Sequence, residues 1–401
     1  MTAATSKDET NVRERLLWLL SAVTFFIFFQ AYMVAPIIPR LSVIFAEPIQ
    51  SIGLIVPAYL VPYGVATLVY GFMADRVGLW RIMIGSLGAF VVLTALTATA
   101  RSVEMLAFWR VLTGLGASGV VPLALVLVGR LYAYERRGRP LGWLFGAMAG
   151  GMAFGSTFGA ILEPFIGWPG LFLAVGCAAV VLGLLILPYR HFVVGTAQPV
   201  TGNFSDLVRG YRLILGTPRG HRTYSYVLLN SIFHAGVFTW LGVYFEQRYG
   251  LGPVGIGLAL LGYGIPGFVF GPIIGRAADR WGRGRLLPIG LALGAVGAAT
   301  LILDLPLIAA AMAVTVLSLG YDMTQPLFAG IVTALSERPG QAMGLNVFML
   351  FLGFGIGSLA FGEILRLGFG TSLSLFAIIE ILLAALAIRL FRSEIVHGSA
   401  V

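Results

Sequence analysis

The chain has 401 residues, of which 58% are hydrophobic and only 11% are charged, and its formal net charge is +9. So apolar a composition excludes a soluble globular domain, and the long, continuous apolar segments predict membrane-spanning helices rather than a barrel. The arginines lie in short loops between these segments, so the positive charge does not indicate nucleic-acid binding. The single cysteine, Cys177, excludes a disulfide within the chain and a cysteine-based metal site.

Twelve apolar segments follow one another along the chain. The first six are predicted at 16–38, 51–74, 82–100, 104–131, 141–163 and 169–188. A polar stretch at 189–222 contains either a short surface helix or an irregular linker. The last six segments are predicted at 223–246, 253–276, 286–303, 306–334, 342–364 and 372–391. We therefore predict an all-α membrane protein with twelve transmembrane helices in two pseudo-symmetric six-helix bundles, at 1–188 and 223–401, joined by a cytoplasmic linker at 189–222.

The distribution of arginine predicts the orientation in the membrane. Most arginines fall in the loops that would share one side with the N-terminus, whereas the other side carries only Arg40, Arg101, Arg248 and Arg366. Because basic loops remain in the cytoplasm, we expect a multi-pass protein of the cytoplasmic (inner) membrane with both termini cytoplasmic. The first 15 residues are polar and lack the apolar region of a signal peptide, so no cleavable signal is expected.

Two charged turns repeat half a chain apart. The sequence GFMADRVGLWR at 71–81 returns as GRAADRWGRGR at 275–285, and ERRGRPLG at 135–142 returns as ERPGQAMG at 337–344. Repetition over such a distance indicates a duplicated protein. Glycines also recur at close helical spacing in the fifth span, at Gly146, Gly150, Gly151, Gly155 and Gly159, and in the eleventh, at Gly353, Gly355 and Gly357, which predicts close helix packing in lipid.

With two six-helix halves and a G-x-x-x-D-R-x-G-x-x-R turn after the second and eighth spans, the chain resembles the major facilitator superfamily of secondary transporters. Within it, the chain is nearest to the drug/proton antiporter (sugar-efflux-like) branch. The resemblance implies that the two turns hold the cytoplasmic side closed by docking across the halves. The residues it assigns to this cytoplasmic gate are Gly71, Asp75, Arg76, Gly78, Arg81 and Glu135 in the first copy, and Gly275, Asp279, Arg280, Gly282, Arg285 and Glu337 in the second. We expect Gly78 and Gly282 to permit the tight turns.

Two further signatures concern the coupling and direction of transport. RVLTGLGASG in the fourth span places Arg110 where the resemblance implies an arginine linked to proton coupling. GMAFGSTFGA in the fifth span is similar to the antiporter pattern G-x-x-x-G-P-x-x-G-G, except that Ser156 replaces the proline and Ala160 the last glycine. This departure leaves the choice between export and uptake open.

The resemblance also places the first, fourth, seventh and tenth spans around a central cavity. Ionisable groups at membrane depth usually face a bundle interior or water. Asp322 is the best candidate for a proton carrier, and the alternatives are an aspartate held permanently by polar neighbours such as Gln325 or a charge that merely lines the pore. His234, with Asn230 one turn away, is a candidate for substrate or proton contact, with a packing role as the alternative. The complete set of substrate or proton candidates is Asp322, Arg110, His234, Asn230, Gln325, Gln30 and Tyr32.

One acidic residue has no place in this scheme. Glu380 lies near mid-depth in the twelfth span, a peripheral helix in the family that the chain resembles. The sequence leaves open whether its side chain points into the bundle or contacts lipid as a protonated acid.

Together these features predict a proton-coupled, alternating-access transporter that exports a small, partly apolar organic compound across the cytoplasmic membrane. The alternatives are a proton symporter for uptake of a small organic anion or metabolite, with Arg110 as the partner of the anion, and a non-transporting membrane sensor. We expect no enzymatic activity and no catalytic residues, because no catalytic or metal-ligand cluster and no nucleotide-binding loop occurs. The expected partners are a small-molecule substrate, protons and the lipid bilayer. No metal or cofactor is expected, the proton gradient supplies the energy, and a monomer is expected.

Overall fold

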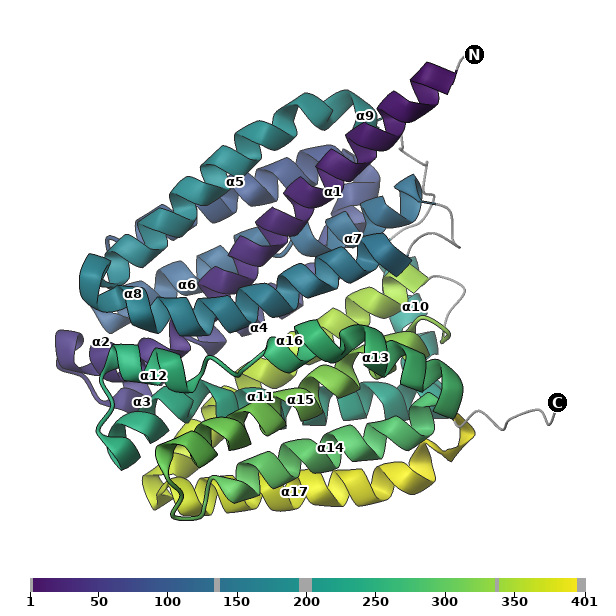
Figure 1. Cartoon of the computed structure of the whole chain (residues 1–401). Helices are drawn as coiled ribbons and strands as arrows, with labels where there is room; N and C mark the ends of the chain where they lie inside the picture. Colours follow the sequence, from purple (N-terminus) through teal and green to yellow (C-terminus); the bar gives the residue numbers. More distant parts are fainter. Residues whose placement is uncertain (1–2, 133–137, 195–203, 336–338, 395–401) are drawn as a thin grey trace.

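The computed structural model describes residues 3–132, 138–194, 204–335 and 339–394. Over these residues the secondary structure consists of helices, with no strand. Helices α1–α9 gather on one side of the molecule and α11–α17 on the other (Figure 1). We call these groups the N half and the C half. The beginning of α1 and the end of α17 lie at the same end of the molecule, the terminal end, and the opposite end is the distal end.

The helices of the N half cross between the terminal and distal ends in several pieces. They are α1 (Ala3–Tyr32), the 3-10 helix η1 (Ala35–Ile37), α2 (Ile38–Phe45), α3 (Ile49–Gly53), α4 (Pro57–Val77), α5 (Leu79–Thr97), α6 (Val103–Ala117), α7 (Val120–Leu131), α8 (Gly138–Ile186), η3 (Leu187–Tyr189) and α9 (Arg190–Val194).

The C half follows a connecting helix, α10 (Phe204–Gly216), so the surface helix is the alternative that the structure adopts in the linker. The remaining helices are α11 (Pro218–Tyr249), α12 (Pro253–Ala259), α13 (Ile265–Trp281), α14 (Arg283–Thr300), α15 (Leu307–Val332), α16 (Pro339–Ile364), η4 (Leu365–Leu367), α17 (Phe369–Leu390) and η5 (Arg392–Glu394).

These helices account for the predicted membrane crossings. Among the described residues, nine helical stretches are long and apolar enough to cross a membrane. One of them, Trp143–Val194, has 52 residues and is long enough to cross twice. The two remaining predicted spans correspond to α12 with α13 and to α14. The prediction of an all-helical, twelve-span membrane fold is therefore confirmed.

Several predicted boundaries were wrong. The first span, expected at 16–38, extends from α1, which begins at Ala3, through η1 to the end of α2 at Phe45. The fifth and sixth spans, expected as separate segments, join within α8, where Gly167 turns the chain with a φ of 70°. Pro164 and Pro169 flank this turn and remove two helical N–H donors.

The eighth span, expected to run unbroken over 253–276, is interrupted. α12 ends at Ala259 and α13 begins at Ile265. Between them Gly264 has a φ of 77°, a left-handed conformation that suits glycine. Pro266 follows in the first turn of α13, where its missing N–H leaves no helical bond unmade. The break lies inside the membrane fold. It brings backbone N–H groups that have no helical acceptor into the interior.

The predicted close packing is confirmed for both sets of glycines except at Gly146, where an added Cβ atom would meet no atom within 4 Å. A Cβ atom on Gly155 would lie 2.6 Å from the carbonyl oxygen of Phe29 on α1, and one on Gly159 would lie 2.7 Å from that of Met33. In the C half, a Cβ atom on Gly353 of α16 would lie 2.6 Å from the carbonyl oxygen of Leu228 on α11. Backbones approach this closely only where the side chain is absent.

The two halves meet tightly at the distal end. A Cβ atom on Gly242 of α11 would lie 2.7 Å from the carbonyl oxygen of Pro36 in η1. A Cβ atom on Gly257 of α12 would lie 2.7 Å from the carbonyl oxygen of Thr157 in α8. Because backbone contacts backbone here, the structure is closed between the halves at this end.

Candidate functional site

His234 lies at the centre of a group of aromatic rings in the C half. Its side chain is buried, and its ring stacks on that of Tyr321 with centroids 3.5 Å apart. Its Nε2 is hydrogen-bonded to the hydroxyl of Tyr263, which lies in the break between α12 and α13. Its Nδ1 has no hydrogen-bond partner among the described residues. His234 thus connects α11 to α15 and to the helix break, and its Nδ1 remains able to form a further hydrogen bond.

Asp322 occupies the other side of the same helix break. Its Oδ2 accepts hydrogen bonds from the backbone N–H of Gly267 at 3.0 Å and from the hydroxyl of Ser318 at 2.9 Å. The N–H of Gly264 donates to the same Ser318 hydroxyl at 2.8 Å. These N–H groups belong to the first turn of α13, where a helix has unsatisfied donors and a partial positive charge. The carboxyl group of Asp322 therefore caps the N-terminus of α13.

The neighbours of Asp322 differ from those that the sequence suggested. Gln325, considered as a polar neighbour, has an Nε2 without a hydrogen-bond partner among the described residues, and the partners of Asp322 are Ser318 and Gly267. Sequence analysis missed both partners. The run GYGIPG at 262–267, with its glycines and proline, was the available signal of a break beside Asp322.

Arg110 is fully buried on α6 and is bound by backbone carbonyl groups. Its Nε donates to the oxygen of Ile55 at 3.1 Å, and its Nη2 donates to that of Ala31 at 3.2 Å. Its Nη1 donates to both the backbone oxygen and the side-chain Oε1 of Gln30, each at 3.2 Å. Gln30 and Ala31 lie in the last turn of α1, where carbonyl groups lack helical donors. Arg110 therefore caps the C-terminus of α1, with its guanidinium 4.5 Å from the centroid of the Tyr59 ring.

Asn230 is not directed to His234. Its side-chain Nδ2 donates to the hydroxyl of Thr324 at 2.8 Å, and Asn230 is 2% exposed. The hydrogen bond joins α11 to α15 within the C half. Of the predicted site residues, the structure brings Arg110 into contact with Gln30. It also places His234 beside the helix break that Asp322 contacts, whereas Asn230 binds Thr324 instead.

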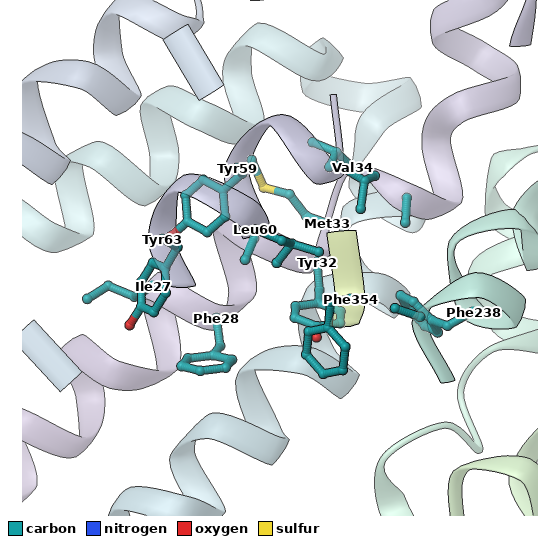
Figure 2. Packing of buried hydrophobic residues seen from close by; sticks show 14 of the residues in the cluster. Ile27, Phe28, Tyr32, Met33, Val34, Tyr59, Leu60, Tyr63, Phe238 and Phe354 are labelled. Carbon is teal, nitrogen blue, oxygen red and sulfur yellow. The ribbon is translucent and has the colours of Figure 1, made fainter. Parts of the chain in front are cut away.

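Tyr32 belongs to an aromatic surface that crosses from one half to the other (Figure 2). Its ring lies 5.5 Å from that of Phe238 on α11 and 6.3 Å from that of Phe354 on α16. The Tyr63 ring of α4 stacks on Phe351 of α16 at 4.4 Å. The hydroxyls of Tyr32 and Tyr63 are buried without hydrogen-bond partners among the described residues. The interface is therefore apolar, with a few unpaired polar atoms.

Comparison with known proteins identifies the family. A sequence profile of the Major Facilitator Superfamily matches residues 20–358 and 249–397, which together cover most of the chain. The chain belongs to the Major Facilitator Superfamily. Membrane transport rather than enzymatic catalysis is therefore its activity, as the repeated turns predicted.

Several relatives of the transporter agree with this result. The chain is 25% identical over 338 residues to the uncharacterized MFS-type transporter YwfA of Bacillus subtilis (strain 168). The match covers 83% of this chain and 81% of YwfA. The chain is 27% identical over 192 residues to Multidrug resistance protein 3 of the same organism, over 47% of this chain and 37% of that protein. The predicted position near the drug antiporter branch is confirmed.

The solved structures confirm the fold. The xylose transporter XylE from E. coli, in a partially occluded inward-open conformation, superposes with a TM-score of 0.74 at 16% identity. The superposition covers 96% of this chain and 99% of XylE. At this identity the likeness extends to the fold alone.

The repeated turns of the transporter lie at the terminal end of each half. Gly78 has a φ of 106° and Gly282 a φ of 81°, so the prediction that these glycines permit the turns is confirmed. Arg76, Arg81, Arg280 and Arg285 are exposed there. Gly71 and Asp75 belong to α4, and Gly275 and Asp279 belong to α13, but the surroundings of these four residues lie outside the described part of the structure, as do Glu135 and Glu337 altogether. The gate assignment remains a prediction.

Glu380 points into the transporter rather than toward lipid. Its side chain is 0% exposed on α17, and neither carboxyl oxygen has a hydrogen-bond partner among the described residues. An unpartnered carboxylate in such surroundings is costly. Of the two alternatives for Glu380, the structure therefore adopts the one in which the side chain points into the bundle.

Proposed function

We propose that the transporter exports a small, partly apolar organic compound in exchange for protons, by alternating access, across the cytoplasmic membrane. Both termini would lie in the cytoplasm, and one chain would be the functional unit. The observation that carries the proposal is the contact of Asp322 with the start of α13, beside the His234–Tyr263 hydrogen bond. It would couple an ionisable group to a helix that begins at a break inside the membrane fold.

The coupling follows from the charge of a helix terminus. An ionised Asp322 faces the positive N-terminal end of α13 and accepts the N–H of Gly267. Protonation removes the negative charge and weakens both hydrogen bonds to this oxygen. α13 is then less firmly held to α15, and the halves can rearrange around the break. The proton load on Asp322 would thus decide which arrangement is favoured.

The substrate class follows from the aromatic surface between the halves. The buried rings of Tyr32, Tyr63, Phe351 and Phe354 contact one another across the halves, and they would suit an apolar or aromatic compound once the halves separate. The unpaired hydroxyls of Tyr32 and Tyr63 and the free Nδ1 of His234 would orient a few polar groups on it. The relatives named Multidrug resistance protein 3 and Methylenomycin A resistance protein support export of this kind.

The arrangement of Arg110 gives less support to uptake of an organic anion. That alternative needs the guanidinium to bind the anion. Each of its three nitrogens already donates to a carbonyl oxygen of Ile55, Gln30 or Ala31. An anion would have to replace these bonds, so export is the better supported function.

The gate would act at the terminal end. The distal end is closed by contacts such as Gly242 with Pro36, so alternation requires that it open while the terminal end closes. The turns at 71–81 and 275–285, with the arginines Arg76 and Arg280, would supply that closure by docking across the halves.

The experiment is transport in proteoliposomes with an imposed pH gradient, with a panel of lipophilic cations, neutral amphiphiles and small organic anions. Wild type is compared with Asp322→Asn, and with Asp304→Asn as a matched control, because Asp304 is fully exposed at the distal end. We expect a cationic or neutral amphiphile to move against the proton flux, and Asp322→Asn to abolish only the proton-driven part.

Two results would contradict the proposal. Movement of an organic anion together with protons, lost in Arg110→Gln, would identify an uptake symporter instead. Unchanged proton coupling in Asp322→Asn would place the proton site elsewhere, with His234 and Glu380 as the next buried groups to test.

A further inference from the structure

A tryptophan of the C half fills the contact between the halves on one side of the distal end. Trp240 lies on α11 and is 2% exposed. A Cβ atom on Gly53, at the end of α3 in the N half, would lie 2.7 Å from Cζ2 of its ring, and one on Gly362 of α16 would lie 3.1 Å from Cε2. The indole N–H donates to the backbone oxygen of Ser358 on α16 at 3.0 Å. The ring therefore contacts α3 and α16 at once, and each helix has a glycine where it meets the ring.

The opposite side of the distal end, between α8 and α12, is closed by backbone contact instead. Gly257 of α12 follows Gly53 by 204 residues, the same offset that separates the two copies of the first charged turn, so the two glycines hold equivalent positions in the duplicated halves. The nearest atom to a Cβ atom on Gly257 would be the carbonyl oxygen of Thr157, at 2.7 Å. At Gly53 the nearest atoms belong to the ring of Trp240. The main chain thus closes one side, and a single side chain closes the other.

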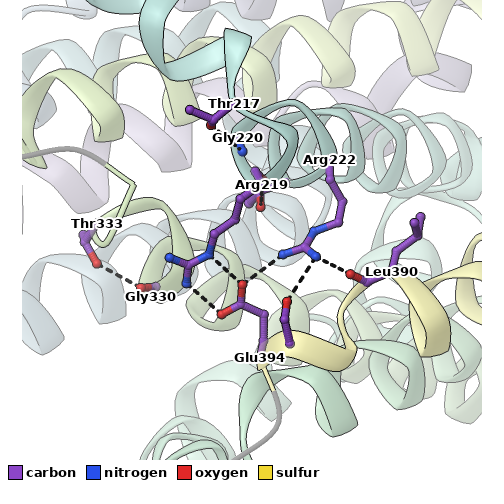
Figure 3. Close-up of polar contacts among 10 residues, drawn as sticks. Thr217, Arg219, Gly220, Arg222, Gly330, Thr333, Leu390 and Glu394 are labelled. Carbon is purple, nitrogen blue, oxygen red and sulfur yellow. Dashed lines mark hydrogen bonds and ion pairs between the residues drawn. The ribbon is translucent and has the colours of Figure 1, made fainter.

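The helix that carries Trp240 is fastened to the rest of the C half. At the terminal end of α11, Arg219 and Arg222 donate hydrogen bonds to the carboxylate of Glu394 in η5, at 2.7 and 2.9 Å (Figure 3). Nearer its distal end, the indole N–H bond ties α11 to α16. Trp240 would therefore stay with the C half when the halves separate, and the contact that breaks would be the one with α3.

We propose that Trp240 is the wedge that holds the distal side of the transporter closed, and that this side opens when the ring withdraws from Gly53. The proposal rests on the alternating access proposed above and assigns part of the distal closure to one side chain. Withdrawal exposes a large apolar ring that is buried in the closed arrangement, so burial of the ring favours closure. Trp240 acts on the arrangement of the halves rather than on substrate or protons, which makes it a positioning residue.

The test is the rate at which N-ethylmaleimide labels one cysteine on the opposite side of the distal end. The purified full-length transporter is studied in mild detergent, without substrate and without a pH gradient. The reporter is Thr157→Cys, at a site that is 2% exposed, in a Cys177→Ser background, because Cys177 is itself exposed. We expect Trp240→Ala to raise the labelling rate roughly tenfold or more, since the loss of a buried aromatic contact shifts an equilibrium by about this factor.

A second variant and two matched controls accompany this measurement. Gly53→Ala keeps the tryptophan but places a methyl group against its ring, so it should also raise the labelling rate. Trp168→Ala removes another buried tryptophan, whose ring contacts those of Phe45 and Phe172 within the N half. Gly370→Ala adds a methyl group near the distal start of α17, where a Cβ atom meets no atom within 4 Å. Both controls should be labelled at the wild-type rate.

Two results would overturn the proposal. An unchanged labelling rate in folded Trp240→Ala would mean that backbone contacts alone close the distal side. An equal rise in Trp168→Ala would show that loss of any large buried ring loosens the fold. If Trp240→Ala does not fold, Gly53→Ala decides the matter, because it retains every side chain of the C half. The labelling needs neither substrate nor protons, so its outcome is separate from that of the transport experiment on the proposed exchange.

Discussion

Arg110 is buried and Asp322 is half-buried, in opposite halves, and each caps a helix end that carries the opposite partial charge. Arg110 binds the carbonyl groups at the C-terminus of α1, and Asp322 binds the N–H groups at the N-terminus of α13. The difference lies in the helices that they cap. α1 leads directly into η1 and the closed distal end, whereas α13 begins at a break inside the fold. Under the proposed function, the same kind of interaction would fix the framework in the N half and regulate a hinge at the break in the C half.

The largest effect should follow from removing the cap on α1. Arg110→Met leaves the carbonyl groups of Ile55, Gln30 and Ala31 without their donor in a buried site. Because each unsatisfied group costs about 1–3 kcal/mol, we expect a loss of stability of about 3 kcal/mol or more. Thermal unfolding in detergent would measure it.

The control for this prediction is Arg101→Met, which removes an exposed arginine at the distal end and should leave the unfolding temperature unchanged. If Arg110→Met instead folds with normal stability but loses proton coupling, Arg110 is part of the transport machinery. The contrast between the two halves would then be wrong.

The second prediction concerns the hinge. A Cβ atom on Gly267 would lie 2.6 Å from Cγ of Asp322, so Gly267→Ala pushes the carboxyl group away from the start of α13. Overpacking of this kind costs about 1–3 kcal/mol. If proton coupling requires the contact between Asp322 and the start of α13, a weakening of that contact by about 1.4 kcal/mol lowers proton-driven transport roughly tenfold. Transport under a pH gradient should fall while the amount of folded protein stays similar.

Gly85→Ala is the matched control, because a Cβ atom there meets no atom within 4 Å. It should transport normally. Normal coupling in Gly267→Ala would mean that the contact with Asp322 is not part of the mechanism.

The third prediction tests whether Asn230 serves packing or substrate binding. Its hydrogen bond to Thr324 joins α11 to α15. In a double-mutant cycle with Asn230→Leu and Thr324→Val we expect a coupling energy of about 0.6 kcal/mol, typical of such bonds in membrane proteins. Thr324→Val should leave the apparent substrate affinity unchanged. A loss of affinity in both variants would place the pair in the binding site.

The hydrophobic pattern of the sequence was sufficient to predict the membrane-spanning fold, but it did not predict the break between α12 and α13. Apolar runs reveal spans because the bilayer demands them, and the repeated turns located Gly78 and Gly282 at their positive φ values. Hydropathy contains no information on backbone dihedral angles. The segment 253–276 was therefore expected to be one helix, although the positive φ of Gly264 interrupts it. The glycines and proline at 262–267 were the only local sign of the break.

The charged residues of the site were found by type, but their partners were not. Arg110 and Asp322 are conspicuous because charges are rare in spans. Their partners are chiefly backbone groups, about which side-chain identity says nothing: the carbonyl of Gln30 lies 80 residues from Arg110, and the N–H of Gly267 lies 55 residues from Asp322. Only the packing of helices distant in sequence determines such contacts.

The smallest effect should come from a charge that is paired by side chains at the membrane surface. Burial alone would raise the pKa of Glu394, but the hydrogen bonds and charges of Arg219 and Arg222 outweigh it, so its pKa is lowered from the usual value. A lowered pKa stabilises the folded state above the ordinary glutamate value of about 4.3, and this contribution is lost as pH falls through the lowered value. Glu394→Gln should therefore reduce stability by about 0.5 kcal/mol or less near neutral pH, and the difference from wild type should vanish in acid. Unfolding temperatures measured across this pH range would test the sign, with Glu363→Gln, whose exposed side chain pairs with Arg366, as the control that should not change. A difference that grew on acidification would mean that Glu394 is held in its protonated form, and Glu394 would then resemble the charged residues inside the membrane fold rather than contrast with them.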